Sequence, residues 1–62
     1  MTEKELFEIA LKYINKGYNI EDLRYGDDLY NASPEEKQQC IEFYDEIQDE
    51  GTKWANEYLK TL

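Results

Sequence analysis

Five acidic residues lie close together in a segment of the chain that contains no basic residue. Between Gln38 and Thr52 there is no Lys or Arg, and the carboxylates are those of Glu42, Asp45, Glu46, Asp49 and Glu50. We call these five residues the acidic stripe, because steps of three and four residues align side chains along one face of a helix. Such a face attracts Lys and Arg side chains of another molecule.

A second acidic cluster precedes the stripe in the sequence. It consists of Glu21, Asp22, Asp27 and Asp28, and Arg24 is the only base among them. If this segment folds beside the helix that carries the stripe, the two clusters can form one negative face. We therefore predict a partner-binding surface made of the stripe assisted by Asp27 and Asp28.

The inventory of reactive residues argues against an enzyme. The chain has no His for acid–base chemistry near neutral pH, and its only Ser stands at a helix start. Cys40 falls among apolar positions, where a thiol behaves as a small hydrophobe. The acidic residues do not follow the alternating pattern of a calcium loop, and the glycines are isolated. We expect no catalytic residue, no metal and no cofactor.

Local signals divide the chain into helices. Thr2 and Glu5 form a capping box, which predicts a helix over 3–16 that ends before Gly17. Asn19 predicts a short helix over 20–25, with an extension to 31 left open. Ser33, followed by Pro34 and by the acid of a second capping box, begins a third helix.

The third helix is predicted to run from 34 to 61. Apolar and small residues recur in steps of four and three, as in a coiled-coil seam, at Cys40, Tyr44, Ile47, Gly51, Trp54 and Tyr58. Because the seam keeps its phase through Gly51, we expect that glycine to lie inside the helix and to let the Trp54 ring or another backbone approach. The resulting prediction is a single all-α domain over 1–62, with two main helices, the third long, and a short middle helix.

Length and charge limit the kinds of partner. Sixty-two residues form one small domain, and 15 acidic against 7 basic residues give a net charge of −8. This charge argues against direct binding of nucleic acid. There is no signal-peptide pattern and no apolar run of membrane-spanning length, so a cytoplasmic protein without membrane contact is expected.

These observations favour a non-enzymatic protein that binds a basic surface of a partner protein. Carboxylates one helical turn apart roughly match the spacing of phosphates along a nucleic acid strand, so the partner could be a nucleic-acid-binding enzyme. In size, acidity and tyrosine content the chain is similar to small phage-encoded inhibitors, DNA mimics among them, although no motif is shared. The alternative is a module that pairs through the seam, as a homodimer or an antitoxin-like partner. A third reading makes the acids solely a means of solubility.

Overall fold

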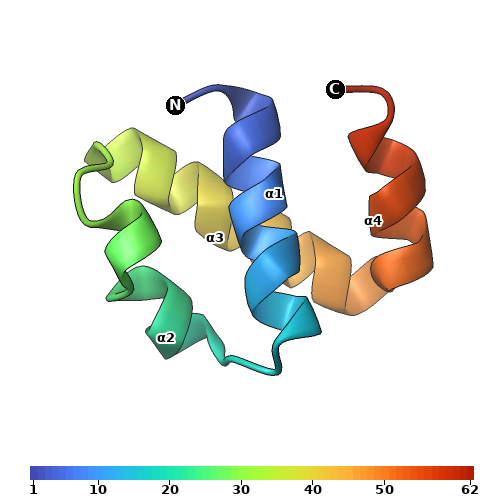
Figure 1. Cartoon of the computed structure of the whole chain (residues 1–62), viewed down its shortest axis with the longest axis horizontal. Coiled ribbons are helices and arrows are strands. Elements are labelled where there is room, and N and C mark those ends of the chain that lie inside the picture. The colour runs from blue at the N-terminus through green and yellow to red at the C-terminus, as the bar shows by residue number, and fades with distance from the viewer.

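The computed structural model describes all 62 residues and contains helices without strands (Figure 1). The elements are α1 (Glu3–Asn15), α2 (Ile20–Arg24), the short 3-10 helix η1 (Asp27–Leu29), α3 (Pro34–Glu50) and α4 (Thr52–Leu59). The all-α prediction is confirmed. Helix α1 crosses over α3, while α2 and η1 lie on one side of α1 and α4 lies on the other.

Capping boxes begin α1, α2 and α3. In the first, the Thr2 hydroxyl accepts the Glu5 N–H at 3.1 Å and the Glu5 carboxylate accepts the Thr2 N–H at 2.8 Å. The same reciprocal pair joins Asn19 to Asp22 at α2, and another joins the residues that begin α3. Each box satisfies backbone amides that the first helical turn leaves unpaired.

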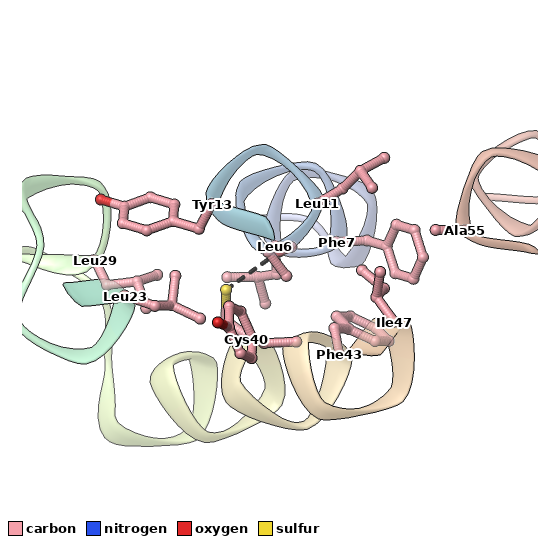
Figure 2. Packing of buried hydrophobic residues seen from close by; sticks show 12 residues of the cluster. Leu6, Phe7, Leu11, Tyr13, Leu23, Leu29, Cys40, Phe43, Ile47 and Ala55 are labelled. Atoms are coloured by element: carbon pink, nitrogen blue, oxygen red, sulfur yellow. Dashed lines mark hydrogen bonds between the residues drawn. The ribbon is translucent and has the colours of Figure 1, made fainter. Parts of the chain in front are cut away.

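The core extends on both sides of α1: Leu23 of α2 and Leu29 of η1 are buried on one side, and α1, α3 and α4 meet around Phe7 on the other (Figure 2). The Phe7 side chain is fully buried, and its ring meets Phe43 edge-on at a centroid distance of 5.0 Å. On the α4 side it lies 5.1 Å from the ring of Tyr58. Farther along the α1–α3 crossing, the Cys40 thiol donates a hydrogen bond of 3.2 Å to the Leu6 carbonyl. One aromatic side chain therefore joins three helices.

The prediction of one helix from 34 to 61 is wrong, because the helix is interrupted at Gly51. This residue has φ 97° and ψ 161°, far from helical values, and α4 turns up beside α1 (Figure 1). Helix α1 crosses α3 and does not run alongside it (Figure 1). A straight continuation would carry Trp54 and Tyr58 beyond it, whereas the bend brings both back onto Phe7. The seam correctly identified core residues but not the continuity of the helix.

The predicted role of Gly51 is also wrong. A Cβ atom at this position would meet nothing within 4 Å, so neither a backbone nor the Trp54 ring approaches it. Glycine is required here for its backbone conformation, since residues that have a Cβ atom rarely adopt this φ and ψ.

Close approach occurs instead at Gly26, between α2 and η1. A Cβ there would clash with the Tyr13 hydroxyl and lie 2.7 Å from the Asp22 carbonyl oxygen. The middle of the chain is accordingly a five-residue α2 followed by a separate 3-10 turn, not one α-helix that reaches residue 31.

Candidate functional site

The acidic stripe lies on the outer face of α3. All five of its residues are exposed, whereas Phe43, Tyr44 and Ile47 on the opposite face are buried. The amphipathic pattern of α3 produces this arrangement, because burial of one face leaves residues half a turn away in solvent. The structure thus brings together the five stripe residues that the sequence predicted.

No basic side chain neutralises the stripe. The ion pairs of the chain join Lys12 to Asp28, Lys60 to Glu57 and the Met1 amino group to Glu36. The one side-chain hydrogen bond to a stripe carboxylate is a long one of 3.4 Å from the Gln38 amide. The negative charge of the acidic stripe therefore faces solvent without an ion pair from within the chain.

The end of α3 at Glu50 changes the electrostatic setting of the stripe. In the longer helix expected from the sequence, these acids would lie far from either end. In the structure, Asp49 and Glu50 occupy the last turn of α3, which contains no basic residue. The helix dipole is negative at this end, so the two carboxylates are unfavourably placed. Like charges four residues apart, such as those of Glu46 and Glu50, add to this cost.

The structure separates Asp28 from the stripe. Both of its carboxylate oxygens accept hydrogen bonds of 2.9 Å from the Lys12 ammonium group on α1. The hydrogen bonding by Lys12 lowers the pKa of Asp28 below its usual value. Asp27 is exposed on η1 and takes part in none of the ion pairs. Of the two aspartates added to the predicted surface, Asp28 is therefore already bound to α1.

Asp22, an acid of the second cluster, completes the capping box of α2, where its carboxylate accepts a hydrogen bond of 3.0 Å from the Asn19 N–H. Burial raises the pKa of the Tyr44 hydroxyl, and the nearby charges of Asp22 and Asp45 raise it further. One acid of α2 and one acid of the stripe therefore both act on this hydroxyl. The sequence placed Asp22 in the cluster but not in the predicted site.

Tyr25 and Tyr30, which lie between α1 and α3 in the sequence, contribute little to the core. The side chains of Tyr25 and Tyr30 are 78% and 76% exposed. Tyr18 differs, since its ring lies 5.3 Å from that of Tyr13 and its carbonyl accepts a hydrogen bond from Tyr44. Exposed tyrosines supply rigid apolar area with a polar tip, which suits a binding surface.

Most residues of the seam are packed in the core of this chain. Cys40, Tyr44 and Ile47 are buried, and Trp54 and Tyr58 are partly buried against Phe7. Burial also raises the pKa of the Cys40 thiol to about 12, so the reactive thiolate is scarce near neutral pH.

Comparisons with protein-family models, curated proteins and solved structures give no match to this chain. The side chains form no group of three or more potential metal ligands. None of the helices combines the length and apolar character needed to cross a membrane.

Proposed function

We propose that this chain is a non-enzymatic binding protein whose acidic stripe engages a basic surface of a partner protein. The observation that carries the proposal is the absence of any basic partner for five exposed carboxylates on one helix face. Asp22 and Asp27 extend the negative surface beyond α3. The carboxylate of Asp28 contributes less, because Lys12 already holds it.

The acidic stripe destabilises α3, which supports a role for these residues in binding rather than in folding. Acids at the C-terminal end of α3 oppose the helix dipole, and neighbouring acids repel one another. Bases at positions 49 and 50 would keep the surface polar and would interact favourably with the helix dipole. Recognition of a cationic surface accounts for acids at these positions.

The geometry favours a partner surface that ordinarily binds phosphates. Stripe residues fall in three layers along α3, at 42, at 45 and 46, and at 49 and 50. Successive layers are separated by one helical turn, about 5 Å, which is similar to the distance between neighbouring phosphates on one strand. We propose that the chain occupies a nucleic-acid-binding site in the manner of a phage-type inhibitor.

The test compares capture of a partner by the native chain and by a variant carrying Glu42→Lys, Glu46→Lys and Asp49→Lys. Tagged protein is incubated with host lysate, washed at low and moderate salt, and the bound proteins are identified by mass spectrometry. Binding of the purified partner is then measured with and without competing DNA or RNA. We expect salt-sensitive binding by the native chain, competition by nucleic acid, and loss of binding in the variant.

A matched control separates the stripe from total charge. Glu3, Glu8 and Glu57 are exposed on α1 and α4, and their reversal to Lys changes the net charge by the same amount. This control is expected to retain the partner. Equal binding by the native chain and the stripe variant would refute the proposal, as would equal loss in the stripe variant and the control.

A further inference from the structure

The junction between α3 and α4 consists of a single residue that interrupts an otherwise continuous helical pattern. The Gly51 N–H donates a helix-type hydrogen bond of 2.7 Å to the Ile47 carbonyl, and the Ala55 N–H donates one of 3.1 Å to the Gly51 carbonyl. The seam also keeps its four-and-three spacing from Cys40 to Tyr58. Only the backbone angles of Gly51 turn α4 away from the axis of α3.

The bend leaves backbone hydrogen bonds unmade. The amides of Thr52, Lys53 and Trp54 donate to no carbonyl of α3, and no side chain caps the start of α4. In a straight helix these three amides would reach the carbonyls four residues earlier, those of residues 48, 49 and 50. Straightening thus improves the helix locally.

In a monomer, straightening would remove α4 from its binding site. Ala55 is fully buried, and the Trp54 and Tyr58 rings lie 6.1 Å and 5.1 Å from the ring of Phe7. A straight helix cannot keep these contacts with its own α1. It can make them with the α1 of a second copy, so that two chains obtain both the continuous helix and the buried aromatic contacts.

We propose that α4 is an exchangeable arm and that the chain forms a domain-swapped dimer in which Gly51 adopts helical angles. The occupant of each α4 site is then α4 of the second copy. Short connections that cannot relax within one chain favour exchange of this kind. The inference rests on the α3–α4 junction and is independent of the proposed role of the acidic stripe.

Two substitutions at one position test the proposal. In Gly51→Ala, the L-alanine disfavours the observed φ of 97° and favours helical angles. A chemically synthesised chain with D-alanine at position 51 can keep the positive φ. We expect a doubling of the 7.5 kDa mass by light scattering for Gly51→Ala and a monomer for the D-alanine chain. Helicity by circular dichroism should rise in the dimer, and the wavelength of maximal Trp54 emission should stay unchanged, because Phe7 of the other copy takes the place of Phe7 of the same chain against the ring.

Gly17→Ala is the control for strain alone, since Gly17 also has positive φ and open space around it. It should remain monomeric. A monomeric folded Gly51→Ala chain would overturn the proposal, as would dimers of the D-alanine or Gly17→Ala chains, or a red-shifted Trp54 emission in the dimer. If Gly51→Ala does not fold, the native and D-alanine chains are refolded at millimolar concentration. A dimer from the native chain alone then supports the exchange, and any other result refutes it.

Discussion

The Tyr44 hydroxyl donates a hydrogen bond of 2.6 Å to the backbone carbonyl of Tyr18, and so joins the middle of α3 to the turn between α1 and α2. The same oxygen accepts a hydrogen bond of 3.3 Å from the Gln48 side-chain amide. Tyr44 therefore joins the turn that leads into α2 to the helix that carries the acidic stripe. The arrangement links the core to the candidate binding surface through one side chain.

Tyr44→Phe should lower the free energy of unfolding by about 1 kcal/mol, the usual net value of one hydrogen bond. The ring keeps its packing, but the Tyr18 carbonyl loses its donor. Thermal unfolding followed by circular dichroism measures the change, and about 1 kcal/mol corresponds to roughly 4–8 °C in a domain of this size. Tyr25→Phe is the control, because the Tyr25 side chain is 78% exposed. Equal melting temperatures of the native and Tyr44→Phe chains would contradict the role assigned to this bond.

Charge reversal should have opposite effects at the two ends of α3. Asp49→Lys replaces an acid in the last turn and should raise the free energy of unfolding by about 0.5–1 kcal/mol. Glu35→Lys makes the same charge change in the first turn and should lower it, because the helix dipole is positive there. Melting temperatures at low ionic strength measure both effects, and added salt should reduce them. Destabilisation by Asp49→Lys would show that its carboxylate serves the fold.

Alkaline pH should destabilise the fold from about pH 9 upward. Burial raises the pKa of Cys40 from 9.0 to about 12, and burial together with Asp28 raises that of Tyr13 from 10.0 to about 12. Between pH 9 and 12 the unfolded chain loses protons that the folded chain retains. The stabilisation is therefore complete below pH 9 and declines as the pH approaches 12.

Thermal unfolding between pH 7 and 11 tests this expectation. The native melting temperature should fall above pH 9, and the variant with Cys40→Ala and Tyr13→Phe should show a shallower slope from a lower starting value. A native melting temperature that stays constant to pH 11 would exclude the effect.

Gly26→Ala should destabilise the chain by about 1–3 kcal/mol, as overpacking of a close contact does. The added Cβ would clash with the Tyr13 hydroxyl and lie 2.7 Å from the Asp22 carbonyl. Tyr13→Phe in the same chain removes only the first clash, so we expect partial rescue in the double variant relative to the sum of the two single changes. Urea unfolding provides the four free energies. Simple additivity would mean that the hydroxyl and the new methyl group do not meet.

The sequence by itself determined where α1, α2 and α3 begin, and its seam identified Cys40, Tyr44 and Ile47 as core residues. A capping box involves residues three apart, so Thr2 with Glu5 specifies the start of α1 without help from the rest of the chain. The acidic stripe was predictable for a similar reason, since its spacing within one helix decides that its members share a face.

Only the tertiary structure decided where α3 ends and which acidic residues form ion pairs within the chain. The seam is compatible with a straight helix, and the bend at Gly51 follows from packing of Trp54 and Tyr58 on Phe7, more than 40 residues away in the sequence. The pairing of Asp28 with Lys12, 16 residues apart, likewise depends on how η1 packs against α1. Local patterns specify helices through neighbouring residues, whereas bends and ion pairs depend on contacts between elements that the pattern does not encode.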